Sequence, residues 1–139
     1  MGDKSLRTEP NAKTDALAHA VIGGAIEVHR ALGPGFLEEV YARALALDLR
    51  SRGIAFEPEK SIRVNYKGQV VGEGKLDLLV GACLIVELKA VQTLAPIHTA
   101  QVIAYLKATG LTLGLLINFN VVRLRDGIRR IVLSPDNDA

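Results

Sequence analysis

Residues 76–90 constrain the fold more than any other segment, because they are apolar apart from three charged side chains. A run this hydrophobic predicts a pair of buried strands, where an unpaired charge costs on the order of several kcal/mol. The charged residues, Asp77, Glu87 and Lys89, must therefore partner one another or a bound cation. Two carboxylates beside a lysine suit a hard divalent cation and a group that activates water.

The loop between these strands decides whether the charges share a face. Glu87 and Lys89 are two residues apart and leave the same face of one strand. A two-residue loop at residues 81–82 would turn Asp77 away from Glu87, whereas a three-residue loop at residues 81–83 sets them opposite each other. Since register follows the hydrophobic pattern, we expect the longer loop or an equivalent bulge. One face would then be wholly apolar, with Leu76, Leu78, Val80, Leu84, Val86 and Leu88.

A buried ion pair between Lys89 and one carboxylate is the structural alternative. It would leave the second carboxylate unneutralised, which is the more costly arrangement. The sequence therefore favours a metal site over a purely structural ion pair.

Two helices are expected before these strands. Thr14 or Asp15 can cap a first helix that runs to about residue 32, and the Gly-Pro-Gly at residues 33–35 ends it. A second helix follows over about residues 36–52. Its apolar stripe comprises Leu37, Val40, Tyr41, Ala44 and Leu45. Glu38 borders this stripe on the side of Tyr41, whereas Glu39 lies opposite it, so Glu38 is the better site candidate and Tyr41 a possible site-facing residue.

A third helix is expected over residues 96–109, with proline at its start and glycine after its end. His98, Gln101 and Tyr105 fall on one face of it, and that face is polar. The apolar stripe expected to face the core comprises Ile97, Ala100, Ala104 and Ala108. A lone histidine is more often structural than a ligand, so both a structural and a site-facing role remain open for His98.

The remaining segments complete an α/β fold with a mixed sheet. Strands are expected over residues 61–66, 69–72, 76–80, 84–89 and 111–118, and a final hairpin over residues 121–124 and 128–133. With 139 residues, the chain suits one domain over residues 12–134, between a disordered lead-in at 1–11 and a flexible tail at 135–139.

Charge and composition say little about partners. The net charge is only +2, which does not by itself imply nucleic acid. Four arginines near the C-terminus either contact DNA or form a solvated strand edge, namely Arg123, Arg125, Arg129 and Arg130. Cys83 is the only cysteine and no apolar run is long enough for a membrane span, so we expect a cytoplasmic protein.

Residues 35–41 resemble the signature of the GxxExxY protein family, through Gly35, Glu38 and Tyr41. Residues 27–30, 86–90 and 115–119 also look like conserved blocks of that family. The resemblance covers roughly residues 14–133. Several spaced blocks in order are more specific than any single short motif.

The family is grouped with the PD-(D/E)XK nuclease-like superfamily, so the resemblance implies a restriction-endonuclease-like αβββαβ core with a mixed central sheet flanked by helices. It implies Asp77 as the motif aspartate, Glu87 and Lys89 as the (D/E)xK pair, and Glu38 as the acidic residue of an early helix. Gln101 and Tyr105 match the QxxxY element of RecB-like members. Leu76 stands where the superfamily's name has proline, and residues 74–77 resemble the GxxD form of RecB-like branches.

The hypothesis that follows is a nuclease dependent on Mg²⁺ or Mn²⁺, for which DNA is favoured over RNA as the expected substrate. Asp77 and Glu87, with Glu38 and the Leu88 carbonyl, would hold one or two metal ions. Lys89 would orient and help deprotonate the attacking water. Gln101 and Tyr105 would position the scissile phosphate or the lysine.

The alternative is a catalytically silent module that binds nucleic acid or a protein partner on a nuclease-like scaffold. The chain has three Phe, three Tyr and no Trp, which argues against a base-stacking platform. All the expected site residues are present, which favours the enzyme. A homodimer would enlarge the small surface that one domain offers to a duplex.

Overall fold

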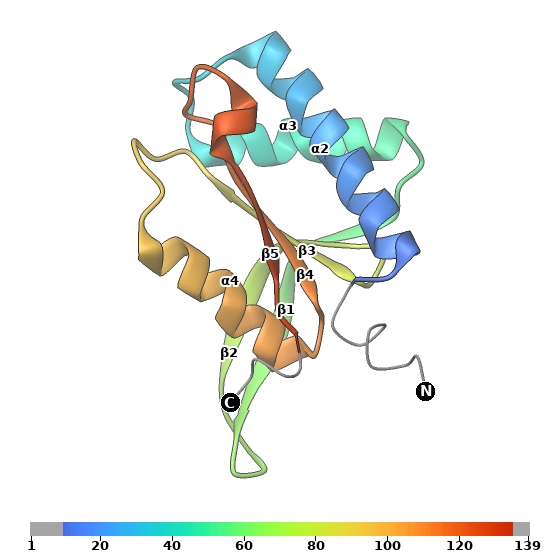
Figure 1. Cartoon of the computed structure of the whole chain (residues 1–139), viewed down its shortest axis with the longest axis vertical. Coiled ribbons are helices and arrows are strands. Elements are labelled where there is room, and N and C mark those ends of the chain that lie inside the picture. Colours follow the sequence, from blue (N-terminus) through green and yellow to red (C-terminus); the bar gives the residue numbers. More distant parts are fainter. Residues whose placement is uncertain (1–9, 135–139) are drawn as a thin grey trace.

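The computed structural model describes residues 10–134 and has the expected α/β architecture. The elements in chain order are α2 (Ala12–Leu32), α3 (Glu38–Ser51), β1 (Phe56–Tyr66), β2 (Gln69–Val80), β3 (Leu84–Lys89), α4 (Pro96–Thr109), β4 (Leu113–Asn118), the 3-10 helix η1 (Leu124–Gly127) and β5 (Ile128–Val132) (Figure 1). This order confirms the αβββαβ core expected from the sequence. Two further expectations, a flexible tail and most of the lead-in, lie outside the described residues.

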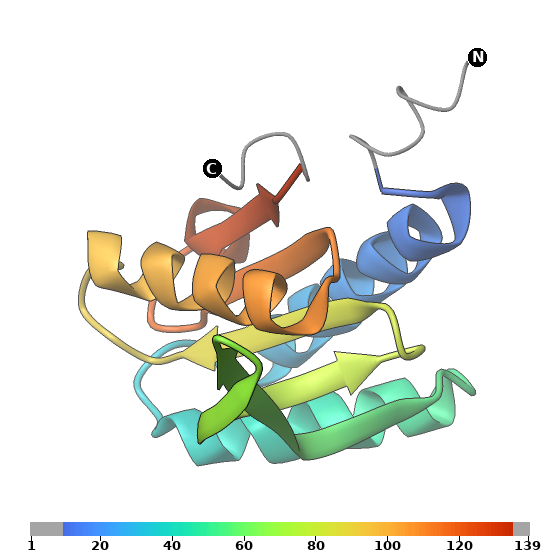
Figure 2. The ribbon, with the colours of Figure 1, turned by 90° about the horizontal axis from the view of Figure 1, so that it is seen from below.

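The five strands form one mixed sheet in the order β1-β2-β3-β4-β5. Only β3 and β4 are parallel, and α4 makes the crossover between them. Figure 2 shows the sheet between α4 on one side and α3 on the other. The β1–β2 hairpin extends beyond the body of the molecule (Figure 1). No helix within residues 10–134 is long and apolar enough to cross a membrane.

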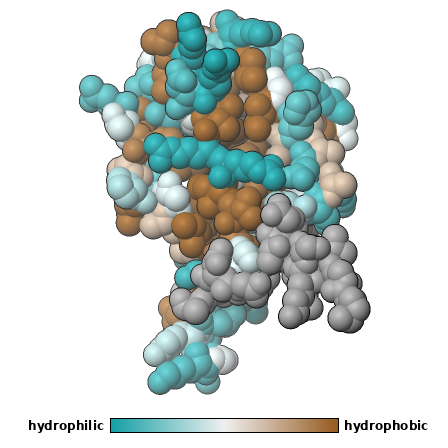
Figure 3. All heavy atoms as spheres, in the orientation of Figure 1, coloured by the Kyte–Doolittle hydropathy of each residue, from teal (hydrophilic) through white to brown (hydrophobic). Residues whose placement is uncertain are grey.

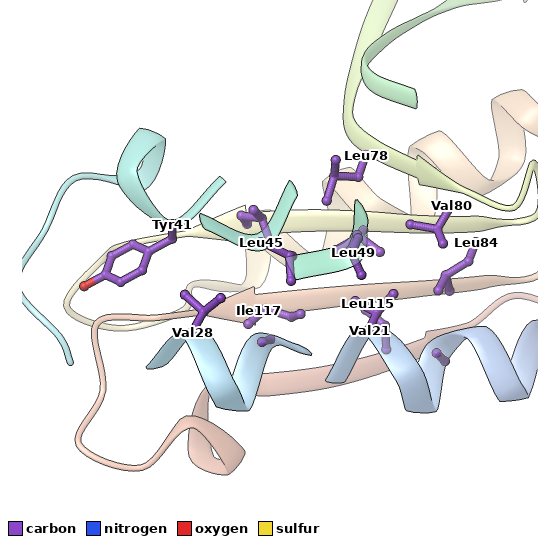
Figure 4. Close-up of a cluster of buried hydrophobic side chains, with 14 of the residues drawn as sticks. Val21, Val28, Tyr41, Leu45, Leu49, Leu78, Val80, Leu84, Leu115 and Ile117 are labelled. Atoms are coloured by element: carbon purple, nitrogen blue, oxygen red, sulfur yellow. The ribbon is translucent and has the colours of Figure 1, made fainter. Parts of the chain in front are cut away.

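Each face of the sheet carries its own hydrophobic core. The larger core packs α2 and α3 on the sheet, where Leu45 and Leu49 of α3 meet Leu78 and Val80 of β2 (Figure 4). The smaller core lies under α4, where Val102 and Leu106 contact Ile85. Burying a side chain of this size contributes about 1.5–3 kcal/mol, so the two cores fix the sheet between its helices.

The register of β2 and β3 confirms the three-residue loop. Val80 pairs with Leu84 and Leu78 with Val86, and the loop at residues 81–83 turns through positive φ angles of 58° at Gly81 and 60° at Ala82. A Cβ atom at Gly81 would meet the Leu17 side chain. Both the positive φ angle and this close contact therefore favour glycine at position 81.

Leu76 departs from the expected face. It was expected beside Leu78, but it packs in the smaller core under α4 while Leu78 packs in the larger one. The pairing of β2 with β3 ends at Leu78, and Glu59 on β1, opposite Asp77, has a positive φ of 49°. Because neither neighbour holds β2 regularly at Asp77, we infer that the strand twists there and sends Leu76 to the other side.

Several element boundaries also differ from expectation. Asn11 caps α2 by accepting a hydrogen bond from the Thr14 backbone N–H, so the lead-in does not reach residue 11 and neither Thr14 nor Asp15 is the cap. The strands expected at residues 69–72 and 76–80 are one strand, β2. The final hairpin was wrong, because residues 121–127 form bends and η1, and β5 pairs with β4 instead.

Two predicted helix stripes need correction. In α3, Leu37 is 77% exposed, and the buried stripe is Tyr41, Leu45 and Leu49. In α4, Ile97 is 69% exposed, and Val102 and Leu106 face the sheet in place of the alanine-rich stripe. Leu37 and Ile97 are exposed although they are large, because Leu37 precedes the first residue of α3 and Ile97 lies in the first turn of α4. Further along α4, Val102 and Leu106 remove more apolar area from water than the alanines would.

Candidate active site

Asp77 and Glu87 are joined by hydrogen bonds between β2 and β3. The Asp77 backbone N–H donates to Glu87 Oε2 at 2.8 Å, and the Leu88 backbone N–H donates to Asp77 Oδ2 at 2.8 Å. These bonds begin where the regular ladder ends, at the Leu78–Val86 pair. The two carboxylates therefore accept hydrogen bonds across β2 and β3 beyond the last regular pair. The predicted odd-loop register is confirmed up to that pair, and it brings Asp77 next to Glu87.

The environment of Glu87 makes its charge costly. The residue is 2% exposed, and burial, together with the nearby Asp77 carboxylate, raises its pKa to about 8. Burial likewise raises the pKa of Asp77, against the opposing effects of the Leu88 N–H and Lys89. Two carboxyl groups held in this way favour a nearby positive charge.

Glu38 stands at the first position of α3, on the side of this pair. Partial burial and the Asp77 carboxylate raise its pKa, whereas Lys89 lowers it. The preference for Glu38 over Glu39 agrees with these electrostatic links, since Glu38 also acts on Glu87. Three elements, α3, β2 and β3, thus each bring an acidic side chain toward one region.

Lys89 lies at the end of β3 and is half-buried. Its ammonium group lowers the pKa values of Asp77, Glu87 and Glu38, so it acts on all three carboxyl groups. Among the described residues no ion pair within 4.0 Å joins Lys89 to a carboxylate. The structural alternative, a buried ion pair, is therefore not formed, and the lysine amine is left for other chemistry.

The carboxylates do not form a closed cage. Across residues 10–134, no three acidic, histidine or cysteine side chains converge closely enough to hold a metal ion together. The expected convergence of Glu38, Asp77 and Glu87 on one cation is thus not preassembled. Asp77 and Glu87 each use one carboxyl oxygen to accept from a backbone N–H, and the other oxygen of each makes no hydrogen bond among the described residues.

The GxxExxY residues of α3 and the preceding turn act together. Gly35 has a φ of 112°, a conformation that favours glycine. The Tyr41 hydroxyl donates to the Gly33 carbonyl at 2.6 Å and accepts from the Phe36 N–H at 3.1 Å. These contacts fix the turn that delivers Glu38 to the first position of α3.

Tyr41 itself is not a site-facing residue, which corrects that expectation. It is fully buried, stacks on Phe119 with ring centres 4.6 Å apart, and belongs to the larger core (Figure 4). Its aromatic ring contributes more by burial than it could at the solvent-facing site.

Tyr105 and Gln101 lie on the flank of α4 nearest β2. Gln101 Nε2 donates to the Tyr105 hydroxyl at 3.4 Å, which confirms that the two share a face. A Cβ atom at Gly74 would lie 2.9 Å from Tyr105 Cε1. Gly74 of the Gly74-Lys75-Leu76-Asp77 sequence therefore lets the tyrosine ring approach β2 three residues before Asp77.

His98 caps α4. Its ring Nδ1 accepts from the Ala95 N–H at 2.9 Å, while the His98 N–H donates to the Ala95 carbonyl at 2.9 Å. These reciprocal bonds satisfy the helix N-terminus and select the structural role for His98.

The four C-terminal arginines do not form one surface. Arg129 pairs opposite Leu116 and Arg130 opposite Leu115, so they leave opposite faces of β5. Arg130 donates to Asp15 at 2.6 Å. Figure 3 shows a hydrophobic band along the face where β5 lies, bordered by hydrophilic side chains. Charges on an exposed edge strand discourage pairing with another chain, which supports the solvated-edge interpretation.

Two further polar residues surround the site and were not predicted. Asn118, 2% exposed, pairs with Lys89 across β3 and β4; its side chain accepts from the Val91 and Asn120 N–H groups and donates to the Val91 carbonyl. It holds the chain directly after Lys89.

Glu59, on β1, is the second residue, and its negative charge raises the pKa of Asp77. A polar residue ending an apolar strand could have indicated Asn118, whereas nothing in the sequence indicates the positive φ at Glu59.

With this geometry in place, comparison with known families decides the classification. The sequence pattern of the PD-(D/E)XK nuclease superfamily matches residues 15–131. The chain belongs to this superfamily. A comparison with curated proteins found no significant match. In a PD-(D/E)XK protein an acidic residue precedes a lysine by two positions, as Glu87 precedes Lys89 here.

Proposed function

We propose that this PD-(D/E)XK protein is a divalent-metal-dependent nuclease that hydrolyses phosphodiester bonds, with DNA as its substrate. The observation that carries the proposal is the buried Asp77–Glu87 pair beside a lysine that forms no ion pair with it in the described chain. Membership of the superfamily supports the nuclease class. We further propose that the protein belongs to the GxxExxY family, in the RecB-like branch of the superfamily. Support comes from the resemblance of residues 35–41 to the GxxExxY signature and of residues 74–77 and 101–105 to RecB-like motifs.

The donor set fits Mg²⁺ or Mn²⁺. Its groups are hard oxygens, from the side chains of Asp77, Glu87 and Glu38 and from the Leu88 carbonyl. Mg²⁺ commonly binds through only one or two carboxylates, with waters and substrate phosphates completing the shell, so a closed cage is not needed. A bound metal ion would polarise the phosphodiester and lower the pKa of a coordinated water.

The side chains supply the remaining functions. The carboxyl groups of Asp77 and Glu87 stay at a fixed place, because backbone N–H groups donate to one oxygen of each. Lys89 orients the attacking water and stabilises the charge that develops on the phosphate. Gln101 and Tyr105 position the phosphate or the lysine from the flank of α4, and Glu38 adds negative charge from α3.

A cleavage assay tests this function directly. Duplex, branched and single-stranded DNA and RNA are incubated with the protein and Mg²⁺ or Mn²⁺. We expect cleavage of a DNA form that stops when the metal is chelated. Asp77→Asn protein is the control for contaminating nuclease and should be inactive. Wild-type protein that cuts no substrate with either metal would contradict the proposal.

A silent binding module is the second candidate. It is favoured by the lack of a three-residue ligand cluster within residues 10–134. Calorimetric titration with Mn²⁺ separates the nuclease from the silent module. The nuclease must bind Mn²⁺, and Glu87→Gln must remove that binding, whereas a silent module needs no bound metal.

A further inference from the structure

A groove of about 990 Å³ opens beside the candidate active site, between α3 and the β1–β2 pair. Glu38, Glu59 and Asp77 line it from three different elements. The same groove is lined along α3 by Arg43 and Arg50. It therefore joins the acidic residues of the site to a surface of opposite charge.

The charges are arranged in order along the groove. Helix α3 begins at Glu38, whose carboxyl interacts with Asp77. Toward its other end, the Arg50 guanidinium lies 5.3 Å from the centre of the Phe56 ring, at the start of β1. The α3 wall of the groove therefore runs from Arg50 and Arg43 to Glu39 and Glu38, and Glu59 and Asp77 line the facing wall.

The guanidinium groups of Arg43 and Arg50 are accessible to an external anion, and the only interaction of either in the described structure is that of Arg50 with the Phe56 ring. They are seven residues apart, so they leave the same side of α3 and are separated by about 10.5 Å along its axis. Both are exposed, and no hydrogen bond or ion pair of theirs occurs in the described part of the chain. Arg52, the residue directly after α3, differs, since Glu27 and Asp48 neutralise it.

We infer that this groove holds one strand of the nucleic-acid substrate as it leaves the Asp77–Glu87 pair, with Arg43 and Arg50 contacting its phosphates. The inference rests on the proposed nuclease function, which supplies the substrate. Arginine suits phosphate because its planar fork makes two parallel hydrogen bonds. Leu47, 66% exposed and on the same wall, offers apolar contact between the arginines.

Binding measurements on matched variants test the groove. Fluorescence anisotropy with a labelled single-stranded oligonucleotide, in Ca²⁺ and over a range of salt concentrations, compares wild type with two double variants. Arg43→Gln/Arg50→Gln alters the groove, and Arg123→Gln/Arg125→Gln removes the same charge far along the chain. At about 0.1 M salt the groove variant should bind roughly 25-fold more weakly, with a salt slope smaller by about 1.4, because each phosphate contact contributes about 0.7.

Arg43→Gln alone guards against a folding artefact. This side chain makes no hydrogen bond or ion pair in the described structure, so the variant should melt like wild type while binding about 5-fold more weakly at about 0.1 M salt. The groove is refuted if the groove and control pairs weaken binding equally, or if the groove variants bind like wild type.

The same experiment distinguishes this inference from the proposed function. Wild-type protein that cuts DNA, while the groove variants bind and cut normally, refutes the groove alone. Wild-type protein that binds DNA through Arg43 and Arg50 but never cuts it refutes the nuclease and upholds the groove. Wild-type protein that binds no nucleic acid refutes both.

Discussion

Glu87 is the residue at which folding and function compete. Its carboxyl is 2% exposed, and burial, reinforced by Asp77, raises its pKa from 4.5 to about 8. Between these values the folded metal-free protein keeps a proton that the unfolded chain has released. Its stability should therefore fall as pH rises through this window. A cation beside Glu87 would oppose that loss of stability. The buried carboxyl therefore lowers the folding stability of the metal-free protein at neutral and higher pH.

Replacing Glu87 with glutamine should remove this cost. Glu87→Gln keeps an oxygen that can accept from the Asp77 N–H but carries no charge. We expect it to equal wild type at pH 5 and to exceed it at pH 8.5 by on the order of 1–3 kcal/mol, while losing Mn²⁺ binding. Chemical denaturation with a chelator, at both pH values, measures the difference. A variant that is less stable at pH 8.5 would show that the Glu87 charge supports the fold.

Among the secondary-structure elements, the contact of α4 with β2 illustrates how a glycine serves a site. Gly74 lies three residues before Asp77, and Tyr105 of α4 occupies the space that a side chain there would need. The tyrosine also accepts a hydrogen bond from Gln101. The spacing of the Gly74–Asp77 motif is thus explained by packing, because it couples the helix that bears Gln101 and Tyr105 to the strand that bears Asp77.

Alanine at two positions of β2 tests this coupling. Gly74→Ala places a Cβ atom 2.9 Å from Tyr105 Cε1, and should destabilise the protein by about 1–3 kcal/mol while displacing the tyrosine. Gly72→Ala is the matched control, since a Cβ atom there meets nothing within 4 Å, and it should change stability little. Thermal melts of both variants provide the comparison. Equal effects at the two positions would mean that strand propensity, and not the tyrosine contact, explains Gly74.

Across the whole molecule, local sequence patterns predicted the strand register, the choice of Glu38 and the bounds of α4. The alternation of apolar and charged residues fixed the register that sets Asp77 against Glu87, because the wrong parity would have buried charge in the larger core. Glu38 was selected by helical geometry alone and does interact with Asp77. The bounds of α4, residues 96–109, also agreed, since proline and glycine mark both ends.

The errors arose where tertiary packing outweighs local pattern. Leu76 lies under α4 because β2 loses regular pairing at Asp77, which no periodicity reveals. Tyr41 was named as a possible site-facing residue, yet its hydroxyl fixes the turn before α3. For His98 the helix face left two roles open, and its hydrogen bond with the Ala95 N–H favours the structural one. The last hairpin was inferred from its turn residues, but residues 121–123 form bends and Leu124–Gly127 form η1, with Gly127 packed against the Asn118 carbonyl.

In the proposed nuclease, Lys89 acts on the reaction and not on the fold. Lys89→Ala and wild type are compared in single-turnover cleavage of the DNA substrate, with binding measured in Ca²⁺ on the same preparations. We predict a fall in the cleavage rate of about 10²-fold or more, and a loss of affinity no larger than one phosphate contact. Cleavage by Lys89→Ala at the wild-type rate would show that Lys89 has no role in the reaction.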